Sequence, residues 1–327
     1  MNRLLCLFGM VGFFGLSGLV IAPVQAETFE QWKHGYKQRA ASVGVSTTML
    51  NRYLDPATLN ERVIELDRKQ PEGRMTLVEY VERTVTDKRV ETGKKKWREN
   101  RQLLAEVERQ SGVSASILVA LWGKETDFGG FTGKSDTISS LATLAYEGRR
   151  RAFFEQELLN AMILADRLNM SPGQMQGSWA GALGQCQFMP SNYNKIAVDG
   201  NNNGRIDLWN ELPDVFYSMA NLLVHEGWKR GQGWGQRVRL GSGFDKSLIG
   251  RDKSPRDFHF WEQRGVRFLQ PVPESVKQSI RIYQPDGVTG PAYALYPNFD
   301  VLMRWNRSGY FATAVGRLSD HLSSVYP

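Results

Sequence analysis

Glu125 is the residue of this 327-residue chain whose type and position most clearly predict chemistry. It ends a mostly apolar run, residues 117–124, and helical spacing places Ile117, Leu121 and Glu125 on one face. A carboxyl group at the end of an apolar stripe faces the interior, where burial raises its pKa. Such a group can act as a general acid near neutral pH. The alternative is a glutamate at a helix end that turns back to solvent.

A second segment, residues 177–191, favours the catalytic interpretation. It reads Gly-Ser-Trp-Ala-Gly-Ala-Leu-Gly-Gln-Cys-Gln-Phe-Met-Pro-Ser. Together with Glu125, Thr126 and Gly129 it resembles the MltB-type lytic murein transglycosylases. Their pattern is Glu-Thr-x-x-Gly, followed by Ser-x-Ala-Gly-Ala-Met-Gly-x-x-Gln-Phe-Met-Pro-Ser. Leu183 replaces the usual Met, and the resemblance covers nearly all of the chain after its N-terminal segment.

The resemblance implies a reaction that needs only one carboxyl group. Glu125 would protonate the oxygen of the MurNAc-β-1,4-GlcNAc bond of peptidoglycan. As a carboxylate it would then take the proton from the muramic 6-hydroxyl, which attacks C1 of the same ring and leaves a 1,6-anhydromuramic acid end. This tethered nucleophile has a high effective concentration. Ser178 and Gln187 would hold Glu125 and the sugar in register without adding charge.

Substrate contacts are also carried over from the resemblance, residue by residue. Tyr146, Arg150, Arg151 and Asn306 match positions that bind the muropeptide in the family. Two aromatic residues near the end, Trp305 and Phe311, stand where family members often have Tyr. They keep an aromatic face for sugar stacking but lose a phenolic hydroxyl, so the departure concerns the peripheral subsites.

Two other functions compete with this one. A lysozyme-type peptidoglycan hydrolase would need a second carboxylate about 5 to 10 Å from the first. Asp127 or Glu147 would then have to lie near Glu125 in the fold. A non-catalytic cell-wall-binding protein would keep the fold but have an altered Glu125 or Gln187, and both residues are intact.

Residues 199–210 resemble an EF-hand calcium loop. Oxygen-bearing side chains stand at positions 1, 3, 5, 9 and 12, and Gly204 is at position 6. Position 12 departs from the pattern because an Asn replaces the bidentate Glu. The predicted ligands of a structural Ca²⁺ are Asp199, Asn201, Asn203, Arg205 through its backbone carbonyl, and Asn210. The alternative is an Asn/Gly-rich turn held by its own hydrogen bonds. We expect no cofactor to be required for the chemistry.

The distribution of apolar and polar residues along the chain predicts the elements that position these residues. We expect a mainly α (α+β) protein with a lysozyme-like core. Residues 27–110 are predicted to form an N-terminal helical region and residues 111–235 the catalytic core. Residues 236–327 are predicted to form a small β-containing region and a closing C-terminal helix. Short alternating runs at 238–240, 266–269 and 279–283 indicate strands, and 308–322 indicates the last helix.

Residues 1–26 have the pattern of a cleavable secretory signal peptide. Arg3 is followed by an apolar stretch and a small-residue cleavage site at 24–26. We therefore expect a monomeric periplasmic protein with no stable membrane anchor. A lone Cys186 would remain after cleavage, and the four histidines form no HExxH pair. The net charge of +7 comes from scattered Lys and Arg residues, which argues against nucleic-acid binding. Peptidoglycan glycan strands are the expected partner.

Overall fold

The computed structural model describes residues 27–69 and 75–323 of the chain. The predicted signal peptide, residues 1–26, lies outside the described residues. The helices are α1 Phe29–Ser42, α2 Thr47–Leu54, α3 Glu61–Arg68, α4 Leu77–Thr84, α5 Asp87–Glu99, α6 Arg101–Ser111, α7 Ala115–Thr126, α8 Thr137–Glu147, α9 Arg151–Arg167, α10 Pro190–Ile196, α11 Leu212–His225, α12 Phe258–Gln263, α13 Pro297–Trp305 and α14 Gly309–Ser323. The strands are β1 Ser135–Asp136, β2 Gln176–Gly177, β3 Gly235–Leu240, β4 Val266–Phe268, β5 Arg281–Tyr283 and β6 Ala292–Leu295. The prediction of a mainly helical fold with a small β-containing part is confirmed.

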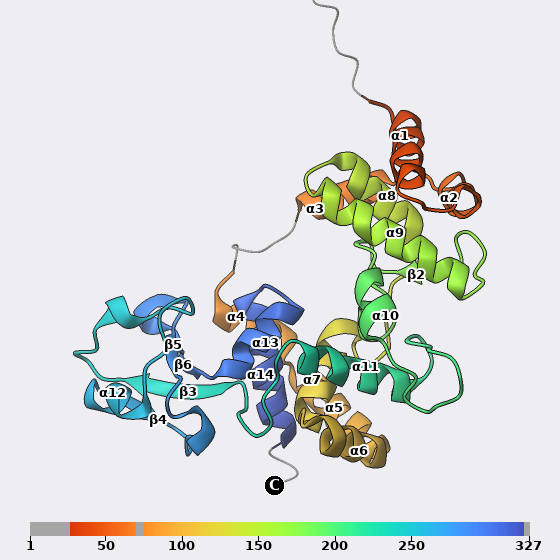
Figure 1. The fold of residues 1–327 in the computed structure, drawn as a ribbon. Coiled ribbons are helices and arrows are strands. Elements are labelled where there is room, and N and C mark those ends of the chain that lie inside the picture. Colours follow the sequence, from red (N-terminus) through yellow and green to blue (C-terminus); the bar gives the residue numbers. More distant parts are fainter. Residues whose placement is uncertain (1–26, 70–74, 324–327) are drawn as a thin grey trace, which may run out of the picture.

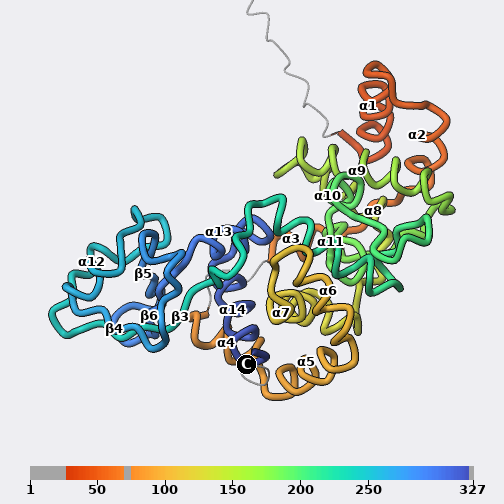
Figure 2. Tube along the Cα trace, turned by 60° about the horizontal axis from the view of Figure 1, so that its bottom comes forward, coloured from red at the N-terminus to blue at the C-terminus, as the bar shows by residue number. Residues whose placement is uncertain are grey.

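The helices form two neighbouring groups (Figure 1). Helices α1, α2 and α3 pack against α8 and α9. In the second group α5, α6, α11 and α14 pack against α7, and α4 packs against α14. In α1 the rings of Phe29, Trp32 and Tyr36 stack in sequence at helical spacing and are buried. The capping box formed by Thr28 and Gln31 starts this helix. Figure 2 shows the same division, with the first helices at one side and the strands at the other.

A four-stranded antiparallel sheet, in the order β4-β3-β6-β5, forms the third part of the molecule. The three strands predicted from alternation lie in β3, β4 and β5, and the closing helix is α14. The fourth strand, β6, is buried at every position, so it has no alternating pattern to reveal it. One sheet face carries its own apolar cluster around Trp261 of α12. Part of the other face, including Tyr293 and Leu295, joins the main helical core.

Three short 3₁₀ turns complete this β region. They are η1 Lys246–Leu248, η2 Glu274–Val276 and η3 Gly287–Thr289. Asp286, just before η3, accepts hydrogen bonds from the backbone N–H groups of Leu77 (2.7 Å) and Val78 (3.0 Å) at the start of α4. A carboxylate at a helix N-terminus satisfies free donors and complements the helix dipole. The β region is thereby fixed to the helical body.

Candidate active site

Glu125 stands in the last turn of α7, a helix whose residues 115–123 are all buried. The helix stops because Asp127 and Phe128 both adopt left-handed backbone conformations, with φ of 51° and 62°. The Phe128 ring then folds back on the helix, and a Cβ added at Gly123 would lie 2.6 Å from it. A glycine at position 123 is therefore required for this tight turn. The turn holds Glu125 at a fixed position at the end of a rigid helix.

Gln185 connects α7 to residues 177–191, the second segment that carries the family resemblance. Its side-chain oxygen accepts a hydrogen bond from the Trp122 indole N–H (2.8 Å), and its backbone carbonyl accepts one from the Thr126 hydroxyl (2.8 Å). Its amide N–H₂ donates to the Trp209 carbonyl (2.8 Å) at the end of the EF-hand-like loop. A Cβ at Gly129 would lie 2.2 Å from the Gln185 side chain. Sequence analysis missed this residue because it occupies a variable slot of the family pattern.

The Glu125 carboxylate accepts a hydrogen bond from the indole N–H of Trp305, at 2.7 Å. Trp305 is the last residue of α13, and its ring makes an edge contact with the buried ring of Phe188. From the sequence, Trp305 was expected in the peripheral subsites; in the structure it contacts the Glu125 carboxylate. The sequence offered one indication of this contact, because Trp305 directly precedes Asn306, a residue that matches a substrate-binding position of the family.

Burial raises the pKa of Glu125 to about 7. The hydrogen bond from Trp305 and the neighbouring charge of Lys124 act in the opposite direction, and desolvation outweighs both. Cys186 is fully buried, and its thiol pKa is raised by desolvation and, to a smaller extent, by the Glu125 charge. A carboxyl group with such a pKa is protonated in a substantial fraction of molecules at neutral pH. It can therefore deliver a proton and take one back.

Lys124 is a second titratable group beside Glu125, and the sequence analysis did not single it out. Its ammonium lies 4.8 Å from the centre of the Tyr80 ring and 5.7 Å from that of Phe311. Burial, followed by repulsion from Arg89, lowers the pKa of Lys124 to about 8. The aromatic faces compensate part of the lost hydration of this cation.

Ser178 and Gln187 shape the loops around α7 through backbone partners. The Ser178 hydroxyl accepts a hydrogen bond from the Ala182 N–H (3.0 Å), which closes a tight turn. Gln187 adopts φ of 51° and donates its amide N–H₂ to the carbonyls of Thr132 (3.1 Å) and Gly184 (3.0 Å). These contacts fix two loops relative to each other. A direct role of either side chain on Glu125 or on a sugar stays a prediction.

The predicted substrate-binding residues fall into two places. Asn306 directly follows Trp305, the residue that contacts Glu125, and its side chain accepts a hydrogen bond from the Ser308 N–H (3.1 Å). Tyr146 and Arg151 instead line a cavity of about 310 Å³ beside α1 and α3. The Tyr146 hydroxyl donates to the Glu27 carbonyl (2.8 Å). Arg150 pairs with the buried Asp67 (3.2 Å), which also bonds Arg149.

The two candidates for the second carboxylate of a hydrolase, Asp127 and Glu147, form contacts elsewhere. Asp127 is exposed and accepts a hydrogen bond from Arg89 (3.2 Å). Glu147 pairs with Arg68 (3.3 Å) and accepts the backbone N–H of Arg149 (3.1 Å). Neither contact directs a second carboxylate toward Glu125. The arrangement therefore fits chemistry with one acid/base group.

The loop at 199–210 is closed by hydrogen bonds in the structure. Asp199 accepts the backbone N–H groups of Asn203 and Gly204, and Asn210 donates its side chain to Asp207. Glu211 lies one residue after Asn210, the ligand predicted at loop position 12. It accepts hydrogen bonds from Asn201, Asn203 and the Arg205 guanidinium. Sequence analysis missed Glu211 because the EF-hand count ends at 210. Among residues 27–69 and 75–323, no group of three or more His, Cys, Asp or Glu side chains forms a cluster that could hold a metal.

Comparisons with known proteins agree with the geometry. The family described as "Transglycosylase SLT domain" matches residues 28–320. The chain is similar to membrane-bound lytic murein transglycosylase B of Escherichia coli, with 32% identity over 241 residues; the match spans 73% of this chain and 65% of that protein, just under two thirds of its length.

Solved structures give the same result. SltB3 of Pseudomonas aeruginosa, in complex with NAG-anhNAM-pentapeptide, superposes with a TM-score of 0.84 and 35% identity over 91% of this chain and 80% of that one. Escherichia coli Slt35 in complex with calcium has a TM-score of 0.77 and 28% identity over 90% of this chain and 93% of that one.

Proposed function

The chain belongs to the transglycosylase SLT domain family, and on this basis we propose that it is a peptidoglycan lytic transglycosylase. It cleaves the MurNAc-β-1,4-GlcNAc bond and forms 1,6-anhydromuramic acid ends. The observation that carries the proposal is the environment of Glu125, whose pKa is about 7 at the end of the buried helix α7. The relative SltB3 was crystallised with a fragment that contains an anhydromuramic sugar, which supports the same product here.

In the proposed mechanism Glu125 acts twice. The protonated carboxyl donates its proton to the glycosidic oxygen, and the bond to C1 breaks. Positive charge develops at C1, and the muramic 6-hydroxyl attacks this carbon while Glu125 takes the hydroxyl proton. Because the nucleophile belongs to the same ring, no second carboxylate is needed to activate water. Ser178 and Gln187 position the sugar, while Trp305 orients the carboxylate through its N–H group.

The identity of the product tests this proposal against a lysozyme-type hydrolase. Purified sacculi digested with the enzyme should release muropeptides that are one water molecule lighter than hydrolysed ones. These products should resist borohydride reduction because no free reducing end forms. Reducible muramic ends as the main product would establish hydrolysis. Binding of sacculi without any cleavage would instead support a non-catalytic wall-binding protein.

We further propose that the protein acts in the periplasm as a monomer without a stable membrane anchor. The observation behind this proposal is the signal-like sequence at 1–26. Within the described parts of the chain, the helices are all too short or too polar to span a bilayer. Intact-mass measurement of the exported protein should give an N-terminus at Glu27. A retained N-terminal segment would contradict this expectation. Light scattering measures the molar mass in solution and so tests whether the protein is a monomer.

Calcium binding to the EF-hand-like loop is the last part of the proposal. The side-chain oxygens of Asp199, Asn201 and Asn203 gather on one turn, as a calcium loop requires. Two features weaken the fit. Asn210 is turned toward Asp207, and the negative charge of Glu211 is already compensated by Arg205. We therefore propose weak, structural binding. The ion's effect would reach α7 through the bonds of Gln185 to Trp209, Trp122 and Thr126.

A further inference from the structure

The β region carries more than half of the chain's net charge. Residues 236–296 contain ten Lys and Arg and six Asp and Glu, a net charge of +4 out of the chain's +7. Several of the cations are compensated within the region or by its neighbours. Arg281 pairs with Asp300 and Lys277 with Glu274, and Arg256 and Arg264 lie over the Phe260 ring. Three of the remaining cations are arginines on one face of the sheet.

Three arginines define this face, which we call the arginine face: Arg237, Arg239 and Arg267. In β3, exposed Arg237 and Arg239 alternate with buried Gln236 and Val238, so both arginines point to the same side. The strand register places Arg239 directly opposite Arg267 of β4. In the described part of the chain no acidic side chain forms an ion pair with any of the three. Like charges opposite each other in a sheet destabilise it.

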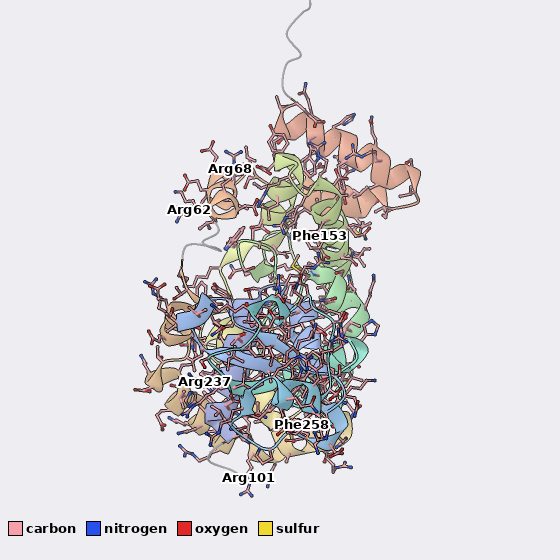
Figure 3. The ribbon with its side chains drawn as sticks, turned by 90° about the vertical axis from the view of Figure 1, so that its left-hand side faces the viewer. Arg62, Arg68, Arg101, Phe153, Arg237 and Phe258 are labelled. Carbon is pink, nitrogen blue, oxygen red and sulfur yellow. The ribbon has the colours of Figure 1, made fainter. Side chains whose placement is uncertain are left out.

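A groove of about 620 Å³ runs beside the arginine face. Its lining includes Arg237, Arg239 and Lys246, and none of the residues that line it is acidic. Ser242 and Thr289 add hydroxyl groups, and η3 forms part of one wall. Figure 3 shows Arg237 in the β region, separated from Arg101 at the lower end of the helices. The groove is therefore built to receive a ligand with negative charges.

The chemistry of the groove fits the carboxylates of an extended peptide and does not fit a membrane surface. Guanidinium groups bind carboxylates through two parallel hydrogen bonds. Arg237 and Arg239 are spaced about 7 Å apart along their strand, so they can hold two carboxylates of one extended peptide. An anionic membrane surface would call for a protruding set of aromatic and aliphatic side chains. The groove has one exposed apolar side chain, Val288.

We propose that the arginine face binds the carboxylates of peptidoglycan stem peptides at a place separate from the cleaved glycosidic bond. The inference rests on the proposed function, which makes peptidoglycan the substrate. The wall would then be bound at two points by a rigid molecule, because Asp286 fixes the groove's η3 wall to α4. Binding of a stem peptide at the arginine face raises the local concentration of glycan at Glu125.

The test uses the Glu125→Gln protein so that sacculi are bound without being cleaved. Adding Arg237→Gln and Arg239→Gln, which removes both guanidinium groups of the groove, should weaken its co-sedimentation with purified sacculi roughly tenfold, the loss expected when charge-assisted hydrogen bonds are removed. The matched control replaces Arg98 and Arg101, two exposed arginines on α5 and α6, with Gln and should leave binding unchanged. Melting curves should show that both double variants are folded.

Two further measurements identify the ligand. Sacculi stripped of stem peptides by an amidase should bind the arginine variant and its parent equally. With Glu125 restored, the arginine variant should cleave short soluble glycan fragments at the parental rate, which separates this proposal from the proposed reaction. Equal binding of intact sacculi by variant and parent would overturn the proposal. A selective loss of binding to phosphatidylglycerol vesicles would show that the face contacts membrane instead.

Discussion

The indole N–H of Trp305 lies 2.7 Å from a carboxylate oxygen of Glu125 and donates a hydrogen bond to it. The bond joins the end of α13 to the end of α7, two segments that are 180 residues apart in the chain. A donor to a carboxylate stabilises its charged form. Trp305 therefore orients the acid and limits the rise of its pKa.

Replacing Trp305 with Phe should reduce turnover and raise the Glu125 pKa. The change keeps an aromatic ring but removes a hydrogen bond to a charged group, which contributes about 1.5 to 3 kcal/mol. We expect kcat to fall about tenfold or more, with a smaller change in KM, and the alkaline limb of the pH profile to move upward. Steady-state kinetics between pH 5 and 9 measure both effects.

Trp261→Phe is the matched control because the Trp261 indole donates to the Ile280 carbonyl in the β region. It should lower stability without moving the pH profile. Trp305→Tyr restores a donor and should recover part of the activity. An unchanged profile for Trp305→Phe would show that the indole only fills space.

Glu125→Gln should abolish turnover and stabilise the protein above neutral pH. The folded-state pKa of Glu125, about 7, exceeds its ordinary value of 4.5, so the folded state binds the proton more tightly than the unfolded state. This contribution to stability is complete below pH 4.5 and is lost as the pH rises through 7. The amide avoids the loss, which is on the order of 3 kcal/mol.

Thermal melts at pH 5 and pH 8 measure the stability change, and sacculus digestion measures a loss of at least about 10²-fold in activity. The gap in melting temperature between variant and wild type should widen from pH 5 to pH 8. Activity within a few-fold of wild type would assign the catalytic acid to another residue.

Lys124→Met should raise the Glu125 pKa, because the Lys124 charge favours the ionised carboxylate. The alkaline limb of the kcat profile should shift upward, by up to about one pH unit for a charge at this range. Lys94→Met, the same change on α5, is the control and should leave the profile in place. No shift in Lys124→Met would mean that its charge is screened from the carboxylate.

Arg205→Ala should tighten calcium binding. In the wild type the Arg205 guanidinium compensates Glu211, and we expect a dissociation constant on the order of 10⁻⁴ to 10⁻³ M. Releasing the carboxylate should lower this constant about tenfold. Titration calorimetry and calcium-dependent melting measure the change. Arg62→Ala, which breaks an exposed ion pair in α3, should have no effect on calcium. If neither protein produces heat with calcium, the loop is a turn only.

The predictions that the structure confirms were those based on local patterns of residues in the sequence. The stripe of Ile117 and Leu121 places Glu125 on the buried helix α7, and alternation around Val238 marks a strand, because both patterns are set by neighbours in the chain. The contact of Trp305 with Glu125 could not be predicted, since no local pattern encodes a pairing across 180 residues. Gln185 was missed because its role depends on the simultaneous approach of two distant segments.

Cys186 gives the molecule an internal reporter of motion. Its thiol is fully buried and has a raised pKa, so it reacts with an alkylating reagent only when the structure around residue 186 opens. The labelling rate therefore measures how often the segment around Cys186 opens, in the same way that amide exchange reports local unfolding. An inhibitor or a calcium ion that makes this opening rarer would slow the labelling of Cys186. The measurement requires no substrate turnover.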